Sequence, residues 1–224
     1  MNSPAQADQD ALMIDVISDV VCPWCFIGKR NLQTALQQIS IEQPQIKPAV
    51  SWLPFFLNPE TSLQGEPYRP FLEKKFGGAA QVDAAWERIT AAGKHAGIDF
   101  AFDKIKLRAN TLNAHRLIHR FQQHGDAERL VERLFEANFL RGEHIGDVEV
   151  LAAIAEECGD DPAAVRSYLD SQEGKAEVIS LAVQAQESGI GGVPFFIFNH
   201  RLALSGAQPP EVFIDAIRQA QLQT

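Results

Sequence analysis

The chain has 224 residues, of which 46% are hydrophobic, so it is long enough and apolar enough to bury a core. Its 29 acidic and 20 basic residues give a formal net charge of −9, which argues against a nucleic-acid partner because binding to phosphates needs a basic surface. No apolar run approaches the ~20 residues that cross a membrane, and residues 1–10 lack the basic start and apolar middle of a secretory signal. We therefore expect a cytoplasmic protein without a membrane partner.

The first quarter of the chain predicts a strand, a helix and a second strand. Residues 1–11 are mostly polar, which predicts a disordered tail. Residues 13–17 form a short apolar run that is typical of a buried strand. The spacing of apolar residues predicts a helix from about residue 23 to residue 38, and Pro23 is favourable at its first position. A second strand is predicted over residues 46–53.

The middle of the chain, residues 68–171, contains no convincing strand and predicts several helices, with Asp147 and Asp161 as N-cap residues. The C-terminal part predicts, in order, a helix over 173–188, a strand over 193–198, a turn at 199–200, a returning strand over 201–204 and a final helix from residue 209. The order of elements therefore indicates one α/β fold that a helical block interrupts.

The strongest chemical signal is Cys22-Pro23-Trp24-Cys25, which lies between the first predicted strand and its helix. Two cysteines at this spacing can close a disulfide with little backbone movement, and the unpaired N–H groups of a helix start favour a thiolate. We predict that Cys22 lies exposed at the helix end and attacks, and that the more buried Cys25 resolves the mixed disulfide. The alternatives are a zinc half-site or a chance pair of core thiols. No further ligands at zinc spacing are evident, so we predict no metal.

A second signal is Gly191-Gly192-Val193-Pro194, which precedes an aromatic strand. Alone, such a Val-Pro pair is usually a strand entry. Beside a cysteine pair it predicts a cis peptide bond that faces the thiols, with the two glycines supplying backbone freedom. The backbone of Val193 could then pair with an extended substrate. Trp24 is predicted either to offer a flat surface to that substrate or to pack as a partly buried tryptophan.

These motifs resemble the DsbA-like branch of the thioredoxin superfamily, and most closely its cytoplasmic FrnE-like group. The resemblance is carried, in chain order, by residues 18–30, 53–55 with 57–59, 110–111 with 114–116, 192–196 and 204–208. It implies a thioredoxin-like fold with an inserted all-helical domain and redox activity at Cys22 and Cys25. The predicted segments are a tail at 1–11, thioredoxin-like parts at 12–66 and 173–224, and a helical insertion at 67–172.

The resemblance also implies a substrate cleft beside the cysteine pair. Relatives in the superfamily place the helix after Asn110 next to the active site, and Phe55 would contact the cleft from a strand end. The predicted substrate-binding residues are Pro23, Trp24, Phe55, Asn110, His115, Val193 and Pro194. We expect no bound cofactor, and consider glutathione as a co-substrate. The expected partners are protein or small-molecule thiols and disulfides, for a monomer or a homodimer.

The sequence thus predicts a cytoplasmic thiol–disulfide oxidoreductase. One alternative is a glutathione-dependent isomerase or transferase, similar to the 2-hydroxychromene-2-carboxylate isomerases and kappa-class transferases, which typically carry serine where this chain has Cys22. Another alternative is a chaperone that works without its thiols.

Cys158 lies on the apolar stripe of its predicted helix, which indicates a buried and inert thiol. His115 and His119 are four residues apart, and we expect one to be packed and the other solvated.

Overall fold

The computed structural model describes residues 11–222. A mixed sheet of four strands, in the order β2-β1-β5-β6, carries the fold. The strands are β1 (Ala11–Ser18), β2 (Lys47–Pro54), β5 (Phe195–Phe198) and β6 (Leu202–Ser205). β1 and β2 are parallel and are joined by the crossover helix α2 (Pro23–Glu42), whereas β1 pairs with β5, and β5 with β6, in antiparallel fashion. The predicted α/β fold is confirmed.

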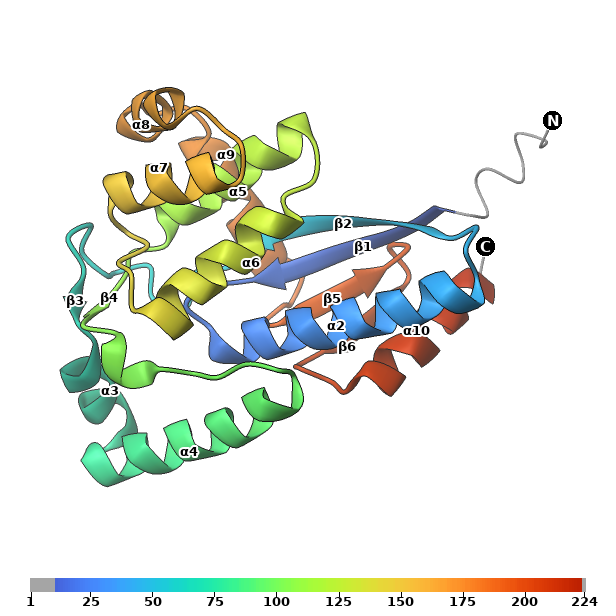
Figure 1. Ribbon diagram of the computed structural model, residues 1–224, viewed down its shortest axis with the longest axis horizontal. Helices are drawn as coiled ribbons and strands as arrows, with labels where there is room; N and C mark the ends of the chain where they lie inside the picture. Colours follow the sequence, from blue (N-terminus) through green and yellow to red (C-terminus); the bar gives the residue numbers. More distant parts are fainter. Residues whose placement is uncertain (1–10, 223–224) are drawn as a thin grey trace.

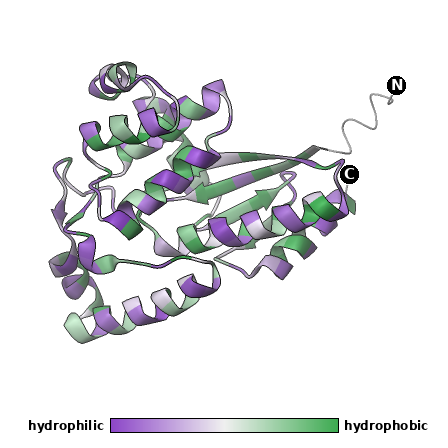
Figure 2. Ribbon diagram, in the orientation of Figure 1, coloured by the Kyte–Doolittle hydropathy of each residue, from purple (hydrophilic) through white to green (hydrophobic). Residues whose placement is uncertain are grey.

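Helices cover both faces of this sheet (Figure 1). On one face α2 packs beside the C-terminal helix α10 (Pro210–Leu222). On the other face α9 (Lys175–Glu187) contributes Ala185 to a small cluster with Ile17 and Phe55. The end of β1, residues 16–18, is buried on both faces, and Figure 2 shows the inner strands largely in the hydrophobic colour.

The segment between β2 and α9 is mainly helical. Its elements are β3 (Glu66–Pro67), α3 (Tyr68–Phe76), α4 (Ala79–His95), η1 (Phe102–Lys104), β4 (Leu107–Arg108), α5 (Leu112–His124), α6 (Glu128–Glu136), the π-helical turn η2 (Ala137–Arg141), α7 (Val148–Glu157) and α8 (Pro162–Asp170). The antiparallel pair β3–β4 was not predicted, because a strand of two residues shows no alternating pattern. No helix among residues 11–222 is both long and apolar enough to cross a membrane.

Local signals in the sequence agree with the structure at several helix starts and at the hairpin. The side chain of Asp147 accepts hydrogen bonds from the backbone N–H groups that begin α7, and Asp161 accepts one from Ala163 at the start of α8. Asn199 and His200 take φ angles of 49° and 55°, as a tight turn between β5 and β6 requires. Helix α2 runs to Glu42, beyond the predicted end near residue 38, because its apolar face continues through the buried Ile39.

The helical segment and the thioredoxin-like part share one continuous core. Phe26 of α2 stacks on Phe135 of α6 with ring centroids 5.0 Å apart and meets Phe100 edge-on at 6.1 Å. The division into segments at 67 and 172 stays a prediction, since apolar contacts cross both limits. The predicted tail lies outside the described residues except for Ala11, where β1 begins, so the tail ends at least one residue earlier than predicted.

Candidate active site

The cysteine pair lies where β1 ends and α2 begins. Cys22 is the N-cap residue of α2, with φ −96° and ψ 112°, and its side chain makes no capping hydrogen bond. Its carbonyl oxygen accepts the N–H groups of Cys25 at 3.0 Å and of Phe26 at 3.3 Å, so its backbone forms the first turn while its thiol is not in a disulfide. The thiol therefore stands at the N-terminal end of a 20-residue helix, beside the unpaired backbone N–H groups of its first turn.

Both thiols are buried: Cys22 is 5% exposed and Cys25 is 1% exposed. The prediction of an exposed Cys22 is wrong, because side chains from distant segments cover it. The Cys22 Sγ faces the carbonyl oxygen of Val193 at 3.8 Å. Tyr68 of α3 lies close enough for a charge on Cys22 to raise the pKa of the phenol, after the larger effect of burial. Val193 and Tyr68 thus lie in the surroundings of the Cys22 thiol although both are distant from it in sequence.

The Val193-Pro194 peptide bond is cis in the structure, and Pro194 is buried against the start of α2. A Cβ atom on Gly28 would stand 3.0 Å from the Cγ of Pro194 and 3.1 Å from the Cζ of Phe196. Glycine at position 28 thus lets the cysteine helix approach the Pro194 loop closely.

The predicted role of Gly191 and Gly192 is wrong. Neither residue has a positive φ angle, and a Cβ atom on either would meet nothing within 4 Å. The loop before Pro194 therefore adopts a conformation that most residue types can take, and the close approach is made at Gly28 instead.

The two thiols have unequal surroundings. Burial raises the pKa of the Cys25 thiol well above its ordinary value, and the hydrogen bond to Cys22 together with its charge raises it further. The backbone N–H of Asp19 and the hydroxyl of Ser18 act in the opposite direction, but more weakly. Cys25 is thus held as a protonated thiol beside Cys22.

A buried carboxylate and a buried imidazole meet beside the cysteine turn. Asp19 is 0% exposed and His115 is 5% exposed. The Nε2 atom of His115 lies 3.4 Å from Oδ1 of Asp19, and Oδ2 of Asp19 accepts the backbone N–H of Leu57 at 2.9 Å. The carbonyl oxygen of Asp19 accepts the N–H of Cys22 at 2.9 Å, which ties this pair to the cysteine turn.

The sequence prediction included His115 but missed Asp19. The available signal was an acidic residue within a few positions of the cysteine pair, directly after an apolar strand. Such a residue is seldom fully buried unless it has a partner or a role. The partner comes from α5, in the helical segment, so the sequence near Asp19 does not identify it.

Phe55 is buried and Asn110 lies in a loop, and the substrate-binding role of each stays a prediction. Phe55 is 7% exposed and packs in the core under α9 rather than at a cleft wall, whereas its neighbour Phe56 meets His115 edge-on with centroids 5.3 Å apart. Asn110 donates to the carbonyl oxygen of Thr61 at 2.7 Å and accepts the N–H of Leu112 at 3.0 Å, so its amide fixes a loop. Asn110 and Phe56 also line an apolar cavity of about 310 Å³.

The remaining predicted residues are partly buried. Pro23 and Trp24 are both half-buried, and Trp24 packs against the main core with part of its surface exposed. Their role in substrate binding, like that of Val193 and Pro194, stays a prediction. His115 is packed and His119 is half-buried, with its Nε2 atom 3.1 Å from the amide nitrogen of Gln123.

Cys158 is half-buried, so the prediction of a fully buried thiol is wrong. Helix α7 ends at Glu157 and leaves Cys158 as the C-cap residue at the helix end, beyond the fully packed part of the apolar stripe. Burial raises the pKa of its thiol, which disfavours the reactive thiolate.

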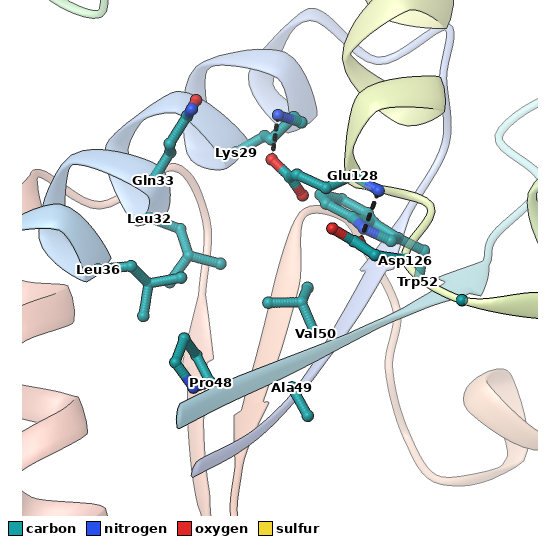
Figure 3. Close-up of a pocket in the computed structure, with 11 residues that line it drawn as sticks. Lys29, Leu32, Gln33, Leu36, Pro48, Ala49, Val50, Trp52, Asp126 and Glu128 are labelled. Atoms are coloured by element: carbon teal, nitrogen blue, oxygen red, sulfur yellow. Dashed lines mark hydrogen bonds and ion pairs between the residues drawn. The ribbon is translucent and has the colours of Figure 1, made fainter. Parts of the chain in front are cut away.

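A second cavity, of about 460 Å³, lies between α2, β2 and the start of α6 (Figure 3). Its lining includes Lys29, which is 2% exposed and pairs with Glu128 and, at 2.6 Å, with Glu132. Neither Cys22 nor Cys25 lines this cavity. These ion pairs tie the cysteine helix to the helical segment, as the dashed line between Lys29 and Glu128 in Figure 3 illustrates.

Among the described residues, no group of three or more His, Cys, Asp or Glu side chains could hold a metal ion. The expectations of no metal and no bound cofactor stay predictions. The groups that the structure brings together at the site are two thiols, the backbone carbonyl oxygen of Val193 and the Asp19–His115 pair.

Comparison with known proteins agrees with this architecture. Residues 13–218 match the model of the DSBA-like thioredoxin domain family. The chain belongs to this family. A relative from Bacillus subtilis (strain 168), the uncharacterized protein YwbO, is 28% identical over 211 residues, which cover 93% of this chain and 96% of that protein.

Solved structures show the same fold. A probable DsbA oxidoreductase from Streptomyces coelicolor superposes with a TM-score of 0.86 at 28% identity, covering 95% of this chain and 91% of that one. The cytosolic disulfide reductase DsbM from Pseudomonas aeruginosa, solved with GSH, has a TM-score of 0.65 at 16% identity, covering 95% of this chain and 100% of that chain. A 2-hydroxychromene-2-carboxylate isomerase has a TM-score of 0.64 at 14% identity, covering 94% and 96%. The last two show likeness of fold alone.

Proposed function

We propose that this protein is a thiol–disulfide oxidoreductase in which Cys22 is the nucleophile and Cys25 resolves the mixed disulfide. The observation that carries the proposal is the unequal pair at the start of α2. Cys22 is the N-cap residue of a 20-residue helix and its thiol makes no capping hydrogen bond, whereas Cys25 is almost fully buried and its thiol has a raised pKa. Membership of a family that contains oxidoreductases supports the same reaction.

In the first step the thiolate of Cys22 attacks one sulfur of a substrate disulfide. A bond forms between Cys22 and that sulfur, and the other substrate sulfur leaves as a thiolate with the electron pair. The helix start stabilises the attacking charge. The carbonyl oxygen of Val193, 3.8 Å from the Cys22 sulfur, stands where it could accept an N–H from an extended substrate chain.

In the second step Cys25 loses its proton and attacks the sulfur of Cys22. The Cys22–Cys25 disulfide forms, and the second substrate sulfur leaves as a thiolate, so the substrate is reduced by two electrons and the protein is oxidised. The reverse sequence oxidises a dithiol substrate. The positions of Cys25 and Cys22 in one helical turn, linked by the hydrogen bond between their backbones, allow both directions.

We also propose that the protein works in the cytoplasm, within the FrnE-like group, with protein or small-molecule disulfides as substrates and glutathione as a co-substrate. The residue pattern around both cysteines supports the group. The likeness of fold to a cytosolic disulfide reductase solved with GSH supports the compartment and the co-substrate. Cell fractionation and a coupled assay with glutathione disulfide would test these points.

The direct test of the reaction is insulin reduction by three single variants. We expect Cys22→Ser to abolish turnover, Cys25→Ser to accumulate mixed disulfides through Cys22, and Cys158→Ser, the matched control, to keep full activity. Near-full turnover by Cys22→Ser would refute the proposal.

Two further assays test the alternative functions. A glutathione-dependent transferase would conjugate glutathione to an aromatic electrophile. A chaperone would still suppress aggregation in a variant that lacks both Cys22 and Cys25.

A further inference from the structure

The cavity between α2, β2 and the start of α6 has an apolar wall. Figure 3 shows Leu32 and Leu36 of α2 facing Val50 of β2 across it. Pro48 and Trp52 of β2 continue this wall. The cavity volume of about 460 Å³ lies within the ~300–1,000 Å³ that is usual for small-molecule sites. The cavity therefore has the size and the apolar surface that a small organic molecule needs.

The indole N–H of Trp52 is a buried donor without an acceptor. Trp52 is 4% exposed, and its Nε1 atom has no hydrogen-bond partner among the described residues. Its backbone, in contrast, is fully paired with the side chain of Gln122, which accepts the Trp52 N–H at 2.6 Å and donates to the Trp52 carbonyl oxygen at 3.1 Å. Because an unpaired buried donor is costly, a ligand that offers an acceptor to this indole would bind more tightly.

The polar end of the cavity is acidic. Asp126 and Glu128, just before and at the start of α6, line it together with Lys29, so two carboxylates face one ammonium group. Lys29 offers no free charge, because it is 2% exposed and pairs with both Glu128 and Glu132. The carboxylate of Asp126 accepts the backbone N–H of Glu128 at 2.8 Å and pairs with no cationic side chain in the described part of the chain. Figure 3 shows both acidic side chains beside the Trp52 indole.

The outer edge of β2 is poorly suited to a polypeptide strand. Backbone groups along a strand face alternate sides, and Trp52 directs both of its groups away from β1, toward Gln122. Val50 and Pro48 therefore face outward as well. Proline has no N–H to donate, so Val50 alone of these three residues keeps both groups for a partner strand. A small molecule fits the cavity better than an added strand.

We propose that this cavity binds a small organic cation, namely an amine with a ring-sized apolar body and a hydrogen-bond acceptor between the two. The body packs on the apolar wall, the acceptor takes the indole N–H of Trp52, and the ammonium group pairs with Asp126. An anion would face the two carboxylates, and a wholly apolar molecule would leave the indole unpaired. The site goes beyond the proposed redox reaction, because neither Cys22 nor Cys25 lines it.

Three probes with one body and different charges test this site. The mono-naphthoyl amides of ethylenediamine, ethanolamine and glycine share a naphthalene ring and an amide carbonyl, and their free ends are positive, neutral and negative. Each is titrated into the full chain by calorimetry. We expect the cation to bind about tenfold more tightly than the neutral probe, as a charge-assisted contact allows, and the anion to bind most weakly.

Two aspartates separate the proposed contact from general charge effects. Asp126→Asn removes the charge and keeps an oxygen that can accept the N–H of Glu128. It should weaken binding of the cation about fivefold, as expected for an exposed ion pair, and leave the neutral probe unchanged. Asp99→Asn is the matched control, because Asp99 is also an exposed loop aspartate but does not line the cavity. It should bind all three probes as wild type does.

Two further variants test the wall and the indole. Val50→Phe places a ring in the cavity and should abolish binding of every probe, while phenylalanine remains favourable in a strand. Trp52→Phe keeps an aromatic ring and removes the N–H, so it should weaken all probes by about fivefold. Wild-type rates of insulin reduction by Val50→Phe and Asp126→Asn would show that these variants are folded.

Equal affinity for the cation and the neutral probe would overturn the inference, as would cation binding that Asp126→Asn leaves unchanged. Wild-type affinity in Val50→Phe would place the ligand elsewhere and also overturn it. So would the absence of saturable cation binding up to about 1 mM, which is a very weak affinity. A variant with serine at both Cys22 and Cys25 should bind the cation as wild type does, so this proposal and the redox function fail independently.

Discussion

His115 and Arg116 are neighbours on α5, both are buried, and their surroundings differ completely. The guanidinium of Arg116 is 2% exposed, and each of its nitrogens donates a hydrogen bond. The acceptors are the side chain of Asn113 and the carbonyl oxygens of Tyr168, Leu169, Ser171 and Glu173. The Nε2 atom of His115, in contrast, makes no hydrogen bond, although it lies 3.4 Å from the carboxylate of Asp19.

This difference separates a buried side chain whose donors are all paired from one that keeps an unpaired polar atom. A buried polar group with every donor satisfied fixes one conformation, and Arg116 fixes the chain between α8 and α9 against α5. A buried polar group with spare capacity has a free site for a proton. Variants at the first kind of site should therefore change stability, and variants at the second kind should change chemistry.

Arg116→Met should give the largest change in stability. Several buried carbonyl oxygens lose their donor, and each unpaired acceptor costs about 1–3 kcal/mol, so the free energy of unfolding should fall by at least about 3 kcal/mol. Urea titration would measure it. Arg116→Lys keeps the charge but has fewer donors, and should lose less. The contrast between Arg116 and His115 would be contradicted if Arg116→Met kept the stability of wild type and instead slowed the release of mixed disulfide.

Gly28→Ala tests the packing that brings the Pro194 loop to the cysteine helix. The added methyl group would crowd the Pro194 and Phe196 side chains at 3.0 and 3.1 Å. Overpacking costs about 1–3 kcal/mol, and the gain in helix propensity returns at most about 1 kcal/mol. We expect a net loss of about 1–2 kcal/mol and slower attack by Cys22.

Gly191→Ala is the control for that change, because its methyl group would meet nothing within 4 Å. It should alter stability by no more than about 0.5 kcal/mol. If the two variants lost equal stability, close approach at Gly28 would not be the reason for its glycine.

The stability of the reduced protein should depend on pH through Cys25. Burial raises the pKa of this thiol in the folded state, so the unfolded chain ionises first. The contribution to stability is complete below the unfolded pKa of about 8.5, and it is lost as the pH rises toward the folded pKa. Chemical denaturation under reducing conditions should therefore show wild type losing more stability than Cys25→Ala above about pH 8.5. Parallel curves would contradict this.

The smallest effect should come from Cys158. It lies far along the chain at the end of α7, and burial raises the pKa of its thiol. Cys158→Ala should leave insulin reduction unchanged. In wild type, alkylation followed by mass spectrometry should label Cys22 before Cys158 at neutral pH. Faster labelling of Cys158 would show that half-burial at a helix end does not protect a thiol here.

The sequence by itself determined the features that depend on near neighbours in the chain. The strand–cysteine–helix order, the caps at Asp147 and Asp161 and the turn at Asn199 all follow from local hydrogen bonding and backbone preference. The spacing of Cys22 and Cys25 within one helical turn is a local feature of the same kind. Such signals operate over a few residues, so they remain visible without a structure.

Only the tertiary structure decided what surrounds those features. The burial of Cys22 depends on segments around Tyr68 and Val193, and the partner of Asp19 comes from α5. A pattern of apolar residues shows which side of an element is buried, but it does not show which distant side chain covers it. For the same reason the sequence could not decide whether Phe55 or Phe56 faces His115, because adjacent side chains point in different directions and packing selects between them.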